Sequence, residues 1–160
     1  MIARDGAHGA GLGGRDRVAG GQRALDEAHR EGLVHRDVKP GNILVASGRE
    51  SESAGHVHLS DFGLTKRPNS KSGITGTGQF MGSIDYAAPE QFEGKPLDAR
   101  TDVYSLGCVA FECLTGTVPF GRDQEAALMY AHLKDRPPKV SERRPGLPGD
   151  VDPVVAGRPD

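Results

Sequence analysis

The spacing of apolar residues along the chain predicts three helices. In residues 21–33, apolar side chains and one histidine recur every three or four positions, and Gly32 supplies a stop signal near the end. Residues 102–116 are strongly apolar, begin with an aspartate and end with a glycine, which is typical of a buried helix with Asp102 at or near its N-cap. Residues 124–133 show the pattern of an amphipathic helix.

Two short stretches have the pattern of strands. Residues 42–47 are apolar, residues 56–63 alternate between apolar and polar, and the polar stretch 47–55 between them is typical of a turn. Neighbouring short strands joined by a turn predict an antiparallel pair around 42–45 and 57–60. The whole pattern therefore predicts an α+β fold that is mainly helical, with short β-hairpins.

The remaining stretches suggest how the chain is organised. Residues 1–21 hold seven glycines and no periodic pattern, so we expect them to be disordered. Residues 64–83 are rich in Ser, Thr, Gly and Lys and are too long for an ordinary connection, which favours a functional loop. Residues 136–160 are rich in Pro and Gly and show no clear element. We expect one folded domain over residues 22–150 and a frayed end over 151–160.

Composition narrows the class of protein. The 160 residues carry a formal net charge of −2 with a pI of about 6.3, which gives no support for a nucleic-acid or anionic-membrane surface. No apolar run approaches the roughly 18 residues that a spanning helix needs, and charges and glycines stand where a signal peptide needs an apolar core. We read Cys108 and Cys113 as small buried hydrophobic side chains in a reducing compartment, and we expect a cytoplasmic protein.

Residues 34–45, VHRDVKPGNILV, place several charged and amide side chains between apolar ends, which indicates a loop with a chemical role. Four signals then follow in order along the chain: HRDVKPGN, DFG, APE after a Ser/Thr-rich segment, and DVYSLG. This order and spacing resembles a protein kinase of the bacterial eukaryotic-like serine/threonine type. The resemblance covers about residues 22–150 and matches the C-terminal lobe.

The resemblance implies ATP and Mg²⁺ as cofactors and assigns the chemistry residue by residue. Asp37 would be the base that accepts the proton of a substrate hydroxyl, and Lys39 would reach the transferred phosphoryl oxygens. Asn42 and Asp61 would supply the oxygen ligands of magnesium. Leu44 is the position on which an adenine ring would rest.

Other matching residues have structural roles in the family. His35 and Phe62 would stack as the lower half of a hydrophobic spine, and Asp102 would hold backbone amides of the turn at 35–37. The family pairs the glutamate of APE with an arginine on later helices, and this sequence departs from that pattern. We therefore expect Glu90 to lack that partner and the apolar helix 102–116 to lose part of its cover.

The long loop 64–83 resembles an activation segment. By resemblance, Arg36 would pair with a phosphorylated residue of this loop and order it, and Thr75 and Thr77 have the spacing of an autophosphorylated pair. Ser83 stands where the family usually has threonine. It would form a hydrogen bond near the catalytic residues and help select Ser/Thr acceptors.

Simpler interpretations exist for single residues. Asp37 alone also fits a helix cap, Asn42 a turn residue, and Asp61 an Asx turn at a strand end. The stretch GAGLGG at 9–14 matches the Gly-rich motif G-x-G-x-x-G, but it begins only 28 residues before Asp37 and no strand flanks it. We do not read it as a nucleotide loop.

The sequence thus predicts a kinase C-terminal lobe, incomplete at both ends, without a convincing Gly-rich loop, VAIK-type lysine or helix glutamate. The first functional hypothesis is ATP-dependent phosphorylation of Ser/Thr on proteins, with doubtful activity for these residues alone. The alternative is a lobe that docks a kinase or substrate without catalysis, or a decayed gene product. The expected partners are a protein substrate bearing Ser or Thr, and a kinase N-terminal lobe or second kinase in trans.

Overall fold

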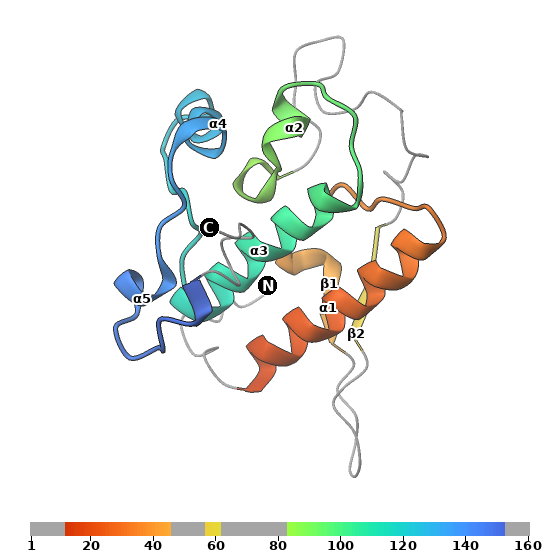
Figure 1. Ribbon diagram of the computed structural model, residues 1–160, viewed down its shortest axis with the longest axis horizontal. Coiled ribbons are helices and arrows are strands. Elements are labelled where there is room, and N and C mark those ends of the chain that lie inside the picture. Colours follow the sequence, from red (N-terminus) through yellow and green to blue (C-terminus); the bar gives the residue numbers. More distant parts are fainter. Residues whose placement is uncertain (1–11, 46–56, 62–82, 153–160) are drawn as a thin grey trace, which may run out of the picture.

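The computed structural model describes residues 12–45, 57–61 and 83–152 (Figure 1). Within these ranges the chain is mainly helical with one two-stranded sheet. In chain order the elements are α1 (Leu12–Arg30), the 3₁₀ turn η1 (Pro40–Asn42), β1 (Ile43–Val45), β2 (Val57–Leu59), the 3₁₀ turn η3 (Ile84–Tyr86), α2 (Pro89–Phe92), α3 (Ala99–Thr115), α4 (Glu125–Lys134) and α5 (Val140–Arg143). None of the described helices is both long and apolar enough to cross a membrane.

The predicted antiparallel strand pair is confirmed. β1 and β2 pair with Ile43 opposite Leu59 and Leu44 opposite His58. Ile43 is buried, whereas Leu44 points to the other face and is 52 % exposed. This alternation is what a short pair needs to cover the core with one face and leave the other open.

Helix α1 begins earlier than the sequence pattern indicated. The expectation of disorder over 1–21 is wrong for residues 12–21, which belong to α1, while residues 1–11 lie outside the described ranges. The predicted stop is confirmed, because Gly32 adopts a φ of 72° and its amide donates to the carbonyl of His29. Tertiary packing of α1 against α3 and both strands accounts for a helix in a glycine-rich segment.

Helix α3 also begins before the predicted position. Its N-cap is Asp98, whose carboxylate accepts the Arg100 amide proton at 2.9 Å. Asp102, which the sequence placed at or near the cap, lies in the first turn of α3. The predicted end is confirmed, because Gly116 takes the left-handed conformation with φ of 80°. Cys108 is buried, and burial raises the pKa of its thiol to about 12, which fits a small hydrophobic side chain.

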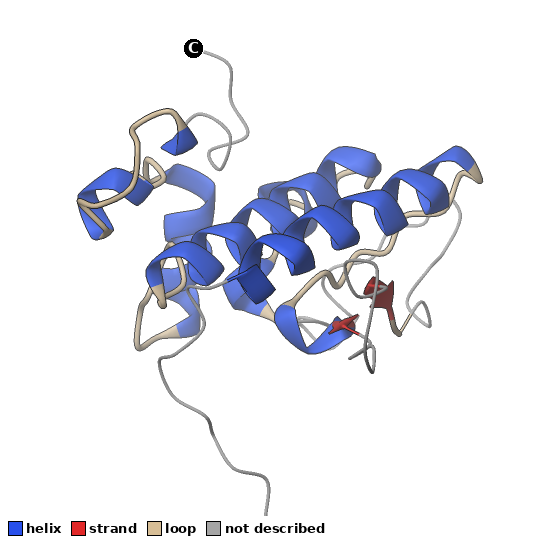
Figure 2. Cartoon of the chain, turned by 90° about the horizontal axis from the view of Figure 1, so that it is seen from below, coloured by secondary structure: helices blue, strands red, loops and turns tan. Residues whose placement is uncertain are grey.

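The core lies between α1, α3 and the strand pair. Figure 2 shows α1 and α3 side by side, with the two strands on one side of them. The buried apolar side chains of this core are Leu25, Val38, Ile43, Leu106 and Val109. A second cluster joins α4 to the loop before it through Phe120, Leu128 and Ala131. The first cluster includes the residue after Asp37, so the core fixes the loop that carries the candidate chemistry.

The last described residues are more ordered than their Pro- and Gly-rich composition suggested. Val140 in α5 is 1 % exposed, and the hydroxyl of Ser141 donates to Asp152 at 2.6 Å. Arg144 donates to the carbonyl of Leu114 at 2.9 Å, near the C-terminal end of α3 where a cation is favourable. α5 thus forms in a stretch where the sequence pattern showed no clear element, within the expected domain 22–150.

The close approach of α1 to β2 gives a stability prediction. A Cβ at Gly20 would lie 2.2 Å from Val57 Cγ2 and 2.3 Å from Val57 Cβ, whereas a Cβ at Gly21 meets Leu106 at 3.4 Å. Gly20→Ala should therefore lower the free energy of unfolding by about 1–3 kcal/mol through overpacking. Gly21→Ala, the matched control in the same helix, should raise it by up to about 1 kcal/mol through helix propensity.

Urea denaturation followed by circular dichroism measures both variants. Equal midpoints for Gly20→Ala and Gly21→Ala would contradict the close packing of α1 on β2.

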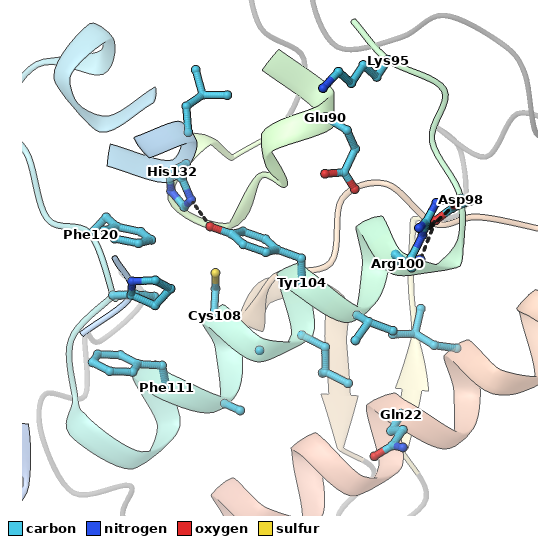
Figure 3. A pocket seen from close by; sticks show the side chains of 18 of the residues that line it. Gln22, Glu90, Lys95, Asp98, Arg100, Tyr104, Cys108, Phe111, Phe120 and His132 are labelled. Carbon is cyan, nitrogen blue, oxygen red and sulfur yellow. Dashed lines mark hydrogen bonds and ion pairs between the residues drawn. The ribbon is translucent and has the colours of Figure 1, made fainter. Parts of the chain in front are cut away.

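Helix α3 borders a cavity of about 1120 Å³, shown in Figure 3 and called here the α3 groove. Its walls come from α1, α2, α3 and the stretch 119–138, and its lining includes Leu25, Glu90, Tyr104, Phe111 and Phe120. Val103 of α3 lines the groove and is 55 % exposed. This exposure agrees with the expectation that part of the helix lacks cover.

His132 of α4 lies at one end of the α3 groove among aromatic rings (Figure 3). Its ring centroid is 4.9 Å from that of Phe120 and 5.9 Å from those of Phe92 and Tyr104. Nδ1 lies 2.8 Å from the Tyr104 hydroxyl, and the buried Nε2 has no hydrogen-bond partner among the described residues. Burial lowers the pKa of His132 to about 4, so the ring is neutral in the folded chain near pH 7.

Because the imidazole of His132 is buried in its neutral form, we expect the free energy of unfolding to fall in acid. The unfolded chain binds a proton on His132 near pH 6.5, while the folded chain resists it down to about pH 4. The contribution of this group is therefore fully present above pH 6.5 and declines as the pH falls toward 4, by about 3 kcal/mol in the free energy of unfolding.

Urea midpoints at pH 7.5 and 4.5 test this, with His132→Phe as the comparison. The drop between the two pH values should be smaller in the variant, because the other titrating groups are common to both proteins. Equal drops would show that His132 is not buried as a neutral ring.

Candidate active site

Three residues of the HRDVKPGN motif and its surroundings contact the carboxylate of Asp37. Lys39 Nζ lies 2.7 Å from Asp37 Oδ2, and Asn42 Nδ2 donates to the same oxygen at 3.3 Å and to the Asp37 carbonyl at 2.8 Å. The backbone amide of Ser83 donates to Oδ1 at 3.4 Å. The Asp37 side chain is 10 % exposed and that of Lys39 is 33 % exposed, so the carboxylate is reachable but held from several sides.

Apolar anchors explain why the chain presents Asp37 in this way. Val34 and Val38 on either side of it are buried in the core, with 4 % and 1 % exposure. Pro40 is the first residue of the turn η1, a position that the preset φ of proline favours. The chain then enters β1 directly. The motif is thus a loop tied to the core at both ends, as its sequence indicated.

Asp102 holds the turn before Asp37, as predicted. Its two oxygens accept the backbone amide protons of His35 at 2.8 Å and of Arg36 at 2.7 Å. Sequence reasoning missed a third donor, because His29 Nε2 of α1 lies 2.7 Å from the same carboxylate. The available signal was a polar ring at helical spacing from Leu25, on the buried face of α1. Asp102 thereby connects α1, α3 and the turn at 35–37.

Arg36 occupies a strained backbone position. Its φ is 70°, in the left-handed region that a non-glycine residue rarely adopts, and its side chain is buried with 5 % exposure. Burial lowers the pKa of the Arg36 guanidinium, and the attraction of Asp102 opposes that change. The position suits a cation held inside the fold next to the candidate base.

His35 connects the turn to the end of β2. The Asp37 amide donates to His35 Nδ1 at 3.3 Å, so Nε2 carries the proton and donates to the Ser60 carbonyl at 2.9 Å. The ring is fully buried. Phe62, the predicted stacking partner of His35, lies outside the described residues.

The two predicted metal ligands are brought to the same end of the strand pair. The Ser60 amide donates to the Asn42 carbonyl at 2.9 Å, and the exposed Asp61 follows directly with a φ of 61°. Because Asn42 uses its amide nitrogen on Asp37, its amide oxygen is the atom left to bind a cation. One carboxylate and one amide oxygen fit a hard cation such as Mg²⁺, which takes its remaining ligands from water or substrate.

Of the four remaining predicted site residues, the structure describes Leu44 and Ser83 but not Thr75 and Thr77. Leu44 presents an exposed apolar side chain on the open face of β1, which suits a flat ring resting on it. Ser83 reaches Asp37 with its backbone amide, whereas the prediction concerned its hydroxyl. Thr75 and Thr77 lie outside the described residues, so their predicted role rests on the sequence.

Residues 83–92 are tied to the rest of the chain by contacts that the sequence did not reveal. The Tyr86 hydroxyl donates to Glu112 of α3 at 2.7 Å, and burial raises the pKa of that phenol. Glu90, expected to lack its arginine partner, accepts a hydrogen bond from the Thr101 hydroxyl at 2.7 Å. Gln91 is buried and bonded at both ends of its amide. No spacing pattern marks Thr101 or Gln91.

Comparison with known proteins agrees with this geometry. The model of the protein kinase domain matches residues 18–146. Serine/threonine-protein kinase PknJ of Mycobacterium tuberculosis is 44 % identical over 136 residues, which cover 84 % of this chain and 23 % of that protein.

Two further kinases of Mycobacterium tuberculosis give the same result. PknB is 40 % identical over 86 % of this chain and 21 % of its own length, and PknD is 45 % identical over 83 % and 19 %. The chain spans about a fifth of the length of these curated relatives. The range matched by the family model includes every described residue around Asp37 and the segment 83–92. The chain therefore belongs to the protein kinase family, with bacterial serine/threonine kinases as its relatives.

Proposed function

We propose that this chain provides the catalytic half of an ATP-dependent protein serine/threonine kinase, namely most of its C-terminal lobe. The observation that carries the proposal is the Asp37 carboxylate, which is held between Lys39 and the Ser83 amide. Phosphoryl transfer asks mainly for positioning and for cancelling negative charge, and a fixed carboxylate beside an ammonium group supplies both. Kinase relatives at 40–45 % identity support the same reaction class.

The roles of the chain's own residues follow from their positions. Asp37 accepts the proton of the substrate hydroxyl, and Asn42 and Ser83 keep its two oxygens oriented for this. Lys39, 2.7 Å from Asp37, neutralises negative charge that develops next to it. Lys39 can serve both the carboxylate and a phosphoryl oxygen because its side chain is long and one-third exposed.

The open end of the strand pair is the proposed nucleotide side. Asn42 and Asp61 would hold Mg²⁺ there, and Leu44 would cover one face of the adenine ring. ATP supplies the phosphoryl group and Mg²⁺ neutralises its oxygens when both are bound. The fixed pairing of Ser60 with Asn42 keeps the two proposed ligands in register.

A chimera tests the proposal. This chain replaces the segment of PknJ that aligns with it, and incorporation of radiolabelled phosphate into a generic basic protein is measured. We expect phosphoserine and phosphothreonine in the product. An inactive chimera that folds and binds ATP and Mg²⁺ would overturn the proposal.

The 160 residues alone should show no turnover. They contain no convincing Gly-rich loop or VAIK-type lysine, so the phosphates lack the groups that grip them in this family. Incorporation of labelled phosphate by the isolated chain, abolished by Asp37→Asn, would contradict the expectation. The matched control is the exposed Asp123→Asn variant.

Loop phosphorylation is the proposed regulatory step. In the active chimera, Thr75 or Thr77 should carry a phosphate anchored by Arg36, because a phosphate adds about −1.5 to −2 charge and accepts two bonds from a guanidinium. Mass spectrometry of the activation-segment peptide checks this. An unmodified peptide in an active enzyme, or unchanged rates in both the Thr75→Ala/Thr77→Ala and Arg36→Ala variants, would remove this role.

A further inference from the structure

Gln91 joins two parts of the site through one side chain. It lies in α2 and is 3 % exposed. Its Oε1 accepts the backbone amide proton of Ala88 at 2.9 Å, and its Nε2 donates to the carbonyl of Arg36 at 3.0 Å. One buried amide therefore connects the segment 83–92 to the turn that carries Asp37.

The carbonyl that Gln91 holds belongs to the strained residue of that turn. Arg36 has a φ of 70°, and its amide is fixed by Asp102 at 2.7 Å. The next amide, that of Asp37, is fixed by His35 Nδ1 at 3.3 Å. Strained residues persist only where surrounding contacts over-determine them. Gln91 supplies the contact on the carbonyl side, so it sets the orientation of the peptide bond that leads into Asp37.

The same segment touches the candidate base directly. The Ser83 amide lies 3.4 Å from Asp37 Oδ1, and the Tyr86 hydroxyl anchors the segment on Glu112 of α3. A shift of residues 83–92 would thus act on Asp37 from both sides, through its carboxylate at Ser83 and through its backbone at Gln91.

We propose that Gln91 is a positioning residue that couples the conformation of residues 83–92 to the orientation of Asp37. An amide side chain satisfies both neighbours without taking up a proton. An ionised carboxylate keeps the acceptor for Ala88 but places a second acceptor against the Arg36 carbonyl. An apolar side chain leaves a buried amide and a buried carbonyl unpaired. The kinetic part of this inference rests on the proposed kinase function, whereas the structural part does not.

Amide hydrogen exchange of the ¹⁵N-labelled 160-residue chain tests the structural part. Gln91→Glu should increase the exchange rate of the Asp37 amide at least tenfold and leave the Ala88 amide protected. Gln91→Met should increase both. The amide of Val109 in the core of α3 serves as the reference for global opening, and Gln22→Glu and Gln22→Met on the exposed face of α1 are the matched controls.

The pattern of exchange decides between positioning and general support. If the rates at Asp37 and Val109 rise by the same factor, Gln91 stabilises the fold without positioning the turn, and the inference is wrong. It is equally wrong if the Asp37 rate does not change in either variant. If Gln91→Met does not fold, Gln91→Glu still separates the two contacts.

The chimera tests the kinetic part. Gln91→Glu should lower kcat roughly tenfold to a hundredfold, since small misplacements of a reacting group have effects of this size. KM for ATP should stay unchanged, because Gln91 contacts neither Asn42 nor Asp61 in the described hydrogen bonds. A change in KM with constant kcat would overturn the coupling. A wild-type chimera without activity would count against the proposed function, while the exchange experiment would still decide the role of Gln91.

Discussion

Replacing Asp37 by asparagine is expected to lower the phosphorylation rate of the chimera by roughly 10²–10⁴-fold, the usual contribution of a positioned acid–base group. The amide has nearly the shape of the carboxylate but cannot take the hydroxyl proton. It also removes the negative charge that holds Lys39 at 2.7 Å. The substrate and ATP contacts stay in place, so kcat should fall while KM values change little.

Steady-state kinetics with a peptide substrate measure this effect. Asp123→Asn is the matched control, because Asp123 is exposed before α4 and far along the chain from the motif. An Asp37→Asn chimera that keeps more than a tenth of the wild-type rate would exclude Asp37 as the base. Circular dichroism should show that both variants fold alike.

Asp102→Ala is expected to have the largest effect on stability. The substitution removes the acceptor that the His35 amide, the Arg36 amide and His29 Nε2 share. Asp102 is fully buried in the wild-type chain. Breaking a buried charged network by removing one member costs about 3–5 kcal/mol. Because domains are stable by only about 5–15 kcal/mol, much of the variant should be unfolded at 37 °C.

Urea denaturation of the 160-residue chain gives the free energy of unfolding. Asp102→Asn keeps an acceptor oxygen and should lose less than Asp102→Ala. The exposed Asp123→Ala should change stability by less than about 0.5 kcal/mol. An Asp102→Ala midpoint equal to that of wild type would show that α1, α3 and the catalytic turn do not depend on this carboxylate.

The parts of the fold that could be predicted correctly from the sequence are mostly those set by local chemistry. Gly32 and Gly116 mark helix ends because only a residue without Cβ adopts positive φ easily, and both take that conformation. A short apolar run located β1 and the alternation of apolar and polar residues located β2, and the two strands pair as an antiparallel hairpin requires. The contact of Asp102 with the turn before Asp37 was expected for a different reason, because the resemblance to protein kinases implied it.

The parts that it missed depend on contacts between distant residues. The N-terminal half of α1 contains Gly13, Gly14 and Gly20, which disfavour a helix locally, yet Gly20 is what lets α1 approach Val57 closely. α5 forms because Val140 is buried, in a stretch whose prolines suggested loose chain. The roles of Gln91 and Thr101 come from partners outside their own helices, so no local pattern could indicate them.

The α3 groove changes how the folded unit should respond to temperature. Val103 of α3 lines the groove and is already 55 % exposed in the native state, so unfolding newly exposes little of its apolar surface. The heat-capacity increment of unfolding scales with that newly exposed surface, at roughly 12–15 cal/mol/K per residue in ordinary globular domains. A smaller increment flattens the curve of stability against temperature. Each apolar side chain that stays exposed at the groove therefore makes this unit slightly less sensitive to cold.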